Sequence, residues 1–297
     1  MMLAWRTATT AWRRPAVAAL ACLAAALLSA CAARGGSRAS TAPVGHERAA
    51  RVSTLSPTLE SFDERLSQAL LVLASNPGAE AHRRVAGEYS RLRILDMAHE
   101  HYTRATDLDP KDPASFDALA RIWRDWGTPH LGLPAAYRAV RLAPKSAVAA
   151  NTLGTVLEAT GQLRLARQWY AQAIALEPDA AFALNNFCYS LILLEQPDAV
   201  DACRRAVAAA PQSSVARNNL GLAYAAAGDL AKAREEFTRV GHAAADYNMG
   251  ILHMAMRDYR AAARQFASAL QANPYSMRIA RRSLQARVAA DAQEGTR

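Results

Sequence analysis

Small and apolar residues recur along the chain at spacings of four and then three, as they do on one face of an α-helix. The pattern occurs in four segments that each end a few residues before a proline. They carry Ala98, Tyr102 and Ala105; Ala166, Tyr170 and Ala173; Ala199, Cys203 and Ala206; and Ala262, Phe266 and Ala269. We therefore predict helices whose small residues let a neighbouring helix approach closely.

A second apolar pattern precedes several of these segments and predicts a partner helix. It consists of Leu153, Gly154 and Leu157; Leu220, Gly221 and Tyr224; and Met249 and Gly250. Gly161 and Gly228 follow as turn residues. A proline closes most units, because proline cannot continue a helix but is tolerated at the start of the next one.

The closing prolines set a regular period. Pro110, Pro144 and Pro178 are 34 residues apart, Pro211 follows after 33, and Pro274 closes the last unit. This period and these residues resemble the tetratricopeptide repeat (TPR), a helix-turn-helix unit. The resemblance implies an all-α fold, a TPR right-handed α-solenoid of about six repeats with capping helices. The expected repeats are 79–112, 113–146, 147–180, 181–213, 214–242 and 243–276.

Helices outside the repeats are expected to cover both ends of the solenoid, which spans residues 57–291. One lies near 57–75 and a basic one covers 277–291, and exposed stack ends favour polar outer faces. Residues 292–297 are predicted to form a disordered tail. Pro129 and Pro134 predict a late start or a kink in the second helix of repeat 113–146. Repeat 214–242 lacks the closing proline, so its second helix should end near Val240.

The first 30 residues have the pattern of a secretory signal peptide, with three arginines, no acidic residue and an apolar stretch over 16–28. That stretch rises only about 20 Å as a helix, so a retained transmembrane anchor is the weaker alternative. The tetrapeptide Leu28-Ser29-Ala30-Cys31 resembles the bacterial lipobox, which implies cleavage before Cys31 and lipidation of its thiol. An ordinary cleavage site beside a cysteine stays open as the alternative.

The lipobox resemblance also predicts a location. In lipoproteins of Gram-negative bacteria an aspartate after the modified cysteine favours the inner membrane, and Ala32 stands there instead. We therefore expect an outer-membrane lipoprotein that faces the periplasm. Residues 31–56 are rich in Ala, Arg, Gly, Ser, Thr and Pro, and they predict a flexible tether.

Charge narrows the choice of partner only slightly. The net charge is +9, and removal of residues 1–30 with their three arginines would lower it to +6. Basic and acidic residues are interspersed, and the sequence has no RNA-binding signature or groove-entering basic helix. A nucleic-acid partner is not expected, whereas anionic lipid or acidic protein fits a mildly basic surface.

No motif points to catalysis, a cofactor or a metal. The sequence has no G-x-S-x-G, P-loop, G-x-G-x-x-G, H-E-x-x-H or C-x-x-C pattern, and we predict that the protein is not an enzyme. His99 and His101 are expected to point to different sides of a helix as exposed residues. Trp123 is predicted to lie in the core and Trp126 to be partly exposed.

Cys188 and Cys203 occupy the two predicted helices of repeat 181–213, at about the same level. An oxidising compartment would permit a disulfide between them. Two reduced and buried thiols are the alternative.

In stacked TPR units the first helix lines a concave groove, and the family's groove positions imply partner-binding residues. These are Asn151, Asn185, Asn186, Asn218, Asn219, Tyr247 and Asn248. Asparagine offers two donors and an acceptor, so a row of them can satisfy the backbone of an extended peptide. Alternatively, the asparagines at position six of a repeat only brace adjacent helices. Arginines give the N-terminal groove a basic character that could pair a carboxylate: Arg83, Arg84, Arg121 and Arg124.

Together these features predict a non-catalytic, membrane-anchored scaffold that binds a protein or peptide in its groove. The segments ALNNFCYSLILL and ARNNLGLAYAAAGD resemble TPR pilotins of type IV pili and TPR lipoproteins of tight-adherence pili. That resemblance implies a role in assembling a pilus or secretin. An adaptor for peptidoglycan enzymes, an accessory protein that binds a small ligand, and a self-associating structural repeat stay open as alternatives.

Overall fold

A computed structural model of the chain describes residues 63–295, and over this range all fourteen regular elements are α-helices. The signal peptide, Cys31 and the tether lie outside the described residues. Contacts divide the described chain into an N-terminal unit, residues 63–162, and a C-terminal unit, residues 163–295. None of the helices in residues 63–295 is long and apolar enough to cross a membrane.

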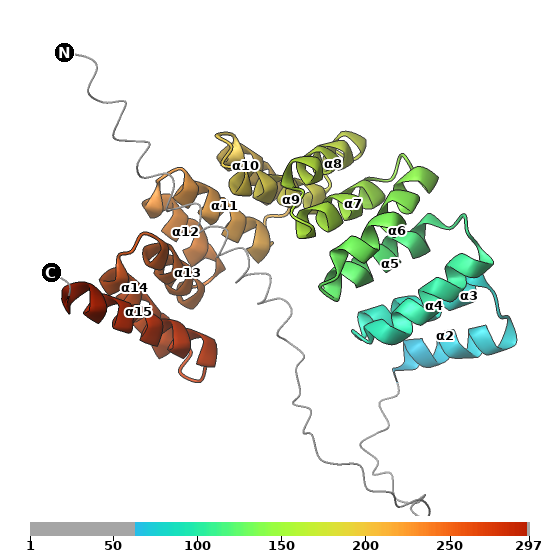
Figure 1. Cartoon of the computed structure of the whole chain (residues 1–297), viewed down its shortest axis with the longest axis horizontal. Helices are drawn as coiled ribbons and strands as arrows, with labels where there is room; N and C mark the ends of the chain where they lie inside the picture. The colour runs from blue at the N-terminus through green and yellow to red at the C-terminus, as the bar shows by residue number, and fades with distance from the viewer. Residues whose placement is uncertain (1–62, 296–297) are drawn as a thin grey trace, which may run out of the picture. The chain divides into compact units, whose positions relative to one another are not determined.

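The N-terminal unit consists of helical hairpins that lie side by side (Figure 1). Helix α3 packs on α4, and α5 packs on α6, while α2 covers α3 and α7 contacts both α5 and α6. Their bounds are α2 Glu64–Ser75, α3 Ala79–Arg91, α4 Leu95–Leu108, α5 Pro113–Asp125, α6 Pro129–Leu142 and α7 Ala147–Ala159.

The C-terminal unit repeats the same arrangement and ends in a longer helix, α15. The hairpins are α9 with α10, α11 with α12, and α13 with α14, and α15 packs on α14. The bounds are α8 Leu163–Leu176, α9 Ala181–Leu193, α10 Ala199–Ala209, α11 Ser214–Ala226, α12 Leu230–Val240, α13 His242–Ala255, α14 Tyr259–Ala272 and α15 Met277–Gly295. Residues 63–295 therefore have the fold of a TPR α-solenoid.

In each repeat, a residue with a left-handed backbone conformation (positive φ) follows the first helix and lets the chain turn into the second helix. Glycine, which adopts this conformation freely, fills the position at 127, 161 and 228, with φ of 78°, 81° and 89°. Arg93, Glu195 and Arg257 fill it elsewhere, with φ of 62°, 54° and 58°. The six positions are successively 34, 34, 34, 33 and 29 residues apart, so the turns keep the sequence period and its one shortened repeat.

The residues spaced by four and then three lie on the buried faces of α4, α8, α10 and α14, as predicted. In the C-terminal unit an aromatic ring of the second helix lies directly on a glycine of the first. A methyl group added at Gly221 would overlap the ring of Phe237, and one added at Gly250 would lie 2.7 Å from the ring of Phe266. Glycine is required at these two positions because the helices approach so closely.

Helix α6 starts at Pro129, in register with the first residues of α4 and α8, so the predicted late start is wrong. Pro129 sits in the first helical turn, where its missing N–H would have no partner in any case. Pro134 lies inside the helix, and α12 ends at Val240 as predicted.

The C-terminal end also differs from the prediction. Helix α15 continues to Gly295, so residues 292–295 are helical instead of part of a disordered tail. Ala292, Gln293 and Glu294 favour helix, and Glu294 forms an ion pair with Arg260 of α14.

The two end helices are less polar on their outer faces than predicted. Leu71 of α2 is 70% exposed, and Met277 of α15 is 82% exposed. Apolar side chains therefore face solvent at both ends of the described chain.

Candidate functional site

The first helices of the N-terminal unit border a hollow of about 460 Å³. Arg83 and Gly87 of α3, Asp117 and Arg121 of α5, and Ala149 of α7 contribute to its lining, together with part of α4. The hollow lies where the family resemblance predicted a groove, and it combines charged groups with small residues.

Asp117 is the group in this hollow that the sequence reasoning missed. Its side chain is buried, its Oδ2 lies 3.1 Å from Nε of Arg121, and its Oδ1 has no hydrogen-bond partner among the described residues. Burial raises the pKa of the Asp117 carboxyl, while Arg121 and Thr152 act in the opposite direction. Asp117 stands 34 residues before Asn151, at position five of its repeat, and that register could have identified it.

The arginines of the N-terminal unit do not form the basic stretch that we predicted. Arg83 and Arg84 both pair with Glu80, and Arg121 pairs with Asp117. Arg124 lies 2.8 Å from Asp125 and donates a hydrogen bond of 2.9 Å to Thr155. Each arginine has a carboxylate one to four positions away on the same helix, so the carboxylates offset much of the positive charge predicted for this part of the groove.

In the C-terminal unit, asparagines join successive first helices. Asn219 of α11 donates a hydrogen bond of 2.9 Å to Oδ1 of Asn185 on α9, and Asn248 of α13 donates one of 3.2 Å to Oδ1 of Asn218 on α11. Asn219 and Asn248, which stand at position six of their repeats, are buried, so each of them braces its own repeat against the preceding one. Asn185 and Asn218 at position five are half-buried, and their amide N–H groups make no hydrogen bond within residues 63–295.

The other candidate groove residues lie in different surroundings. Asn151 and Asn186 are half-buried and both take part in interactions. The half-buried ring of Tyr247 packs at 5.7 Å, edge to face, on Phe266. Phe182 and Val215 stand at position two of α9 and α11 and are 39% and 48% exposed. Partner binding by any of these residues stays a prediction.

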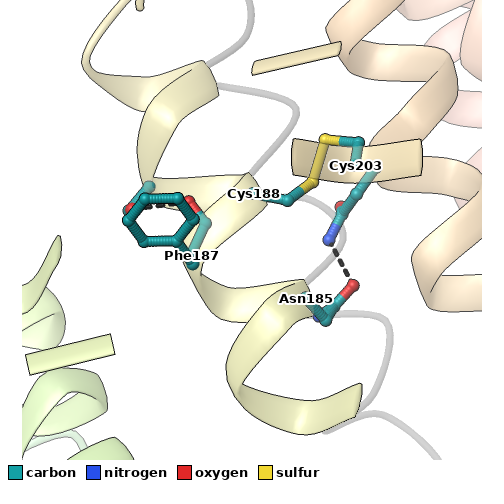
Figure 2. The surroundings of a disulfide bond; sticks show 6 residues. Asn185, Phe187, Cys188 and Cys203 are labelled. Atoms are coloured by element: carbon teal, nitrogen blue, oxygen red, sulfur yellow. Dashed lines mark hydrogen bonds between the residues drawn. A yellow bond between two sulfur atoms is a disulfide. The ribbon is translucent and has the colours of Figure 1, made fainter. Parts of the chain in front are cut away.

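Cys188 on α9 and Cys203 on α10 are joined by a disulfide, with their Cα atoms 4.9 Å apart (Figure 2). Both residues are fully buried. Asn185 lies one turn before Cys188 on the same helix (Figure 2). The disulfide therefore ties the two helices of one hairpin together, one helical turn after Asn185.

Histidines and tryptophans gather between α3, α4 and α5. Nδ1 of His82 lies 3.0 Å from Nδ1 of His101, and the ring of His99 lies 5.0 Å from Trp123 and 5.1 Å from Trp126. These histidines are half-buried, not exposed as predicted, and Trp123 is half-buried rather than fully in the core. Burial lowers the pKa of His99 and of His101.

No group of three or more metal-ligating side chains occurs within residues 63–295. Three hollows are prominent in the described chain: the groove of the N-terminal unit, the histidine region, and a small hollow of about 200 Å³ at the turn between α9 and α10.

Sequence comparison identifies one repeat directly: residues 147–180 match the family model of the tetratricopeptide repeat. None of the curated proteins matches the chain. The family match and the fold agree, so the described chain is a TPR-type helical repeat structure.

Solved structures show the same fold. The chain is similar to PilW, described as a widely conserved type IV pilus biogenesis factor, with 21% identity and a TM-score of 0.59 over 68% of this chain and 96% of that one. A TPR protein from Parabacteroides merdae gives 14% identity and a TM-score of 0.58, over 74% and 90%. The Cut9–Hcn1 hetero-tetramer of APC/C gives 16% identity and 0.62, and this chain covers 75% of its own length but only 46% of that chain.

Proposed function

We propose that this protein is a non-catalytic scaffold that binds an extended segment of a partner protein along its first helices. The observation that carries the proposal is the arrangement on α9 and α11. Exposed Phe182 and Val215 alternate there with Asn185 and Asn218, whose oxygens are held by the next repeat and whose N–H groups remain unpaired among the described residues. Such a row offers apolar contacts to side chains and fixed donors to backbone carbonyls.

The test is photo-crosslinking in cells from a photoreactive residue at Val215, with mass spectrometry of the adducts. Leu165 on α8 is the matched control, because it is similarly exposed in the same unit but lies on a second helix. We expect one partner protein to be captured from position 215 and not from 165. Phe182→Ser should weaken that capture, because its exposed ring supplies neighbouring contact area. Equal capture from both positions would place the binding surface elsewhere.

We propose further that lipid on Cys31 anchors the scaffold to the outer membrane, facing the periplasm. The lipobox-like residues before Cys31 support this location, and a partner-binding domain on a tether would reach envelope proteins. Metabolic labelling with a fatty acid should mark the wild-type chain and not Cys31→Ser. Labelling that persists in the variant would refute the proposal that lipid on Cys31 anchors the protein.

The partner we favour is a component of a pilus or secretin assembly. The support is the resemblance of the repeat segments to pilus-assembly TPR lipoproteins, together with a fold likeness to PilW over nearly all of that chain. Crosslinks from Val215 to a pilus or secretin subunit would sustain this assignment. Crosslinks to a cell-wall enzyme would replace it while leaving the scaffold proposal intact.

A further inference from the structure

The outer face of α15 is unusual for the end of a helical repeat stack, because large apolar side chains point into solvent there. Leu284 and Val288 are 55% and 58% exposed, and Met277 is more exposed still. The three follow one another at spacings of seven and four, so they form one stripe along the helix. The buried face, which contains Ile279 and Ala286, lies on the opposite side.

Arginines border this stripe and leave it positively charged. Arg278, Arg281 and Arg287 are exposed, and no carboxylate of residues 63–295 forms an ion pair with any of them. Of the two acidic residues on α15, Glu294 is already paired with Arg260. Asp291 alone opposes the three arginines, near the end of the helix.

The apolar face of α2, at the other end of the described chain, lacks this charge. Its exposed side chains are Leu70, Leu71 and Val72, but Arg65 is its only cation and that residue pairs with Glu88 of α3. Of the two end helices of residues 63–295, only α15 therefore combines an exposed apolar stripe with unpaired cations. This is the pattern of a helix that lies in the plane of a membrane interface.

We propose that the outer face of α15 docks on an anionic phospholipid surface. Met277, Leu284 and Val288 enter the head-group region, and Arg278, Arg281 and Arg287 contact the lipid phosphates, with their stems lying along the apolar boundary. This docking does not depend on the peptide groove or on lipid at Cys31. It would give the C-terminal unit its own contact with the membrane.

The experiment places a photoreactive residue at Leu284 in the full chain and adds vesicles of phosphatidylcholine with about a quarter phosphatidylglycerol. The same residue at Leu165 is the matched control, since Leu165 is also an exposed leucine of the C-terminal unit. Any attachment of the chain through residues 1–62 acts equally on both. We expect lipid adducts from position 284 at about tenfold the yield from 165.

Two further measurements test the charge. Replacing the three arginines, Arg278→Gln, Arg281→Gln and Arg287→Gln, should reduce the lipid adducts from position 284 by about tenfold, as should vesicles of phosphatidylcholine alone. Because all three side chains are exposed, the variant is expected to keep its fold. Equal lipid yields from 284 and 165, or adducts from 284 to a second copy of the chain, would overturn the proposal.

Discussion

The two units are built from the same type of repeat, but different contacts hold their helices together. In the N-terminal unit titratable groups pack at and beside the contacts between helices: the His82–His101 pair, His99 against two tryptophans, and the buried Asp117, which pairs with Arg121 on its own helix. In the C-terminal unit a disulfide, two asparagine pairs and phenylalanine rings seated on glycine take their place. One backbone pattern thus accepts contacts that respond to acid in one unit and to reductant in the other.

The largest expected effect comes from the disulfide. Reduction, or the double variant Cys188→Ala and Cys203→Ala, should lower the free energy of unfolding of the C-terminal unit by about 3 kcal/mol, since the bond closes a loop of 15 residues. Hydrogen exchange resolved by peptide should show lost protection over residues 163–295. If protection fell equally over residues 63–162, the units would not differ in the way proposed.

Glycines on the first helices of the two units provide the second test. Gly221→Ala should destabilise the C-terminal unit by about 2 kcal/mol, because the new methyl group overlaps the ring of Phe237. Gly87→Ala should instead stabilise the N-terminal unit by up to about 1 kcal/mol, since an added methyl meets only the hydroxyl of Tyr102, at 3.8 Å, and alanine favours helix. Urea denaturation of each variant measures the sign, and equal signs would contradict the comparison.

These two glycines show which features of the fold could be predicted from the sequence and which could not. The spacing of Ala262, Phe266 and Ala269 was sufficient to predict a helix and its buried face, because a 3.6-residue period needs no partner to be recognised. Whether a ring rests on a glycine depends on how closely two helices approach, which no single segment specifies. The fold was therefore predictable, while the tightness of each hairpin was not.

The candidate site was predictable in part for the same reason. Repeat register located Asn185 and Asn218 in the expected first-helix series, but it could not show that Asn219 and Asn248 are buried braces. The predicted basic groove was wrong because side-chain pairing with Glu80 and Asp117 depends on rotamers and on neighbouring helices. Asp117 was not predicted although it stands at position five of its repeat, because the burial of a carboxylate depends on the neighbouring helices.

The bracing asparagines supply a smaller effect. Asn219→Ala should lower the free energy of unfolding of the C-terminal unit by about 1 kcal/mol, since one buried hydrogen bond to Asn185 is lost. Asn218→Ala removes the acceptor of the corresponding bond and should cost a similar amount. The matched control is Gln271→Ala on the exposed face of α14, which should be nearly neutral. If Asn219→Ala were equally neutral in thermal unfolding, the pair would not act as a brace.

The smallest expected effect is a pH dependence of the N-terminal unit. A hydrogen bond between Nδ1 of His82 and Nδ1 of His101, 3.0 Å apart, needs a proton on one of these atoms and a lone pair on the other. Protonation of both rings therefore removes the acceptor and places two positive charges side by side. Burial lowers the pKa of both rings, and Arg104 adds to this at His82 while Glu100 opposes it at both. The unfolded chain therefore binds more protons than the folded one, so stability rises with pH and is lost as pH falls below about 6.5.

Hydrogen exchange over residues 63–162 should accordingly quicken, after correction for the intrinsic rate, as pH falls from about 7.5 to 5.5. His101→Gln should flatten this dependence, because glutamine keeps a polar partner for His82 but does not titrate. The C-terminal unit also contains a histidine whose pKa is lowered by burial, His253, so its slope should be shallower but not zero. An unchanged slope in His101→Gln would assign the acid sensitivity to other groups, with His99 between Trp123 and Trp126 as the next residue to replace.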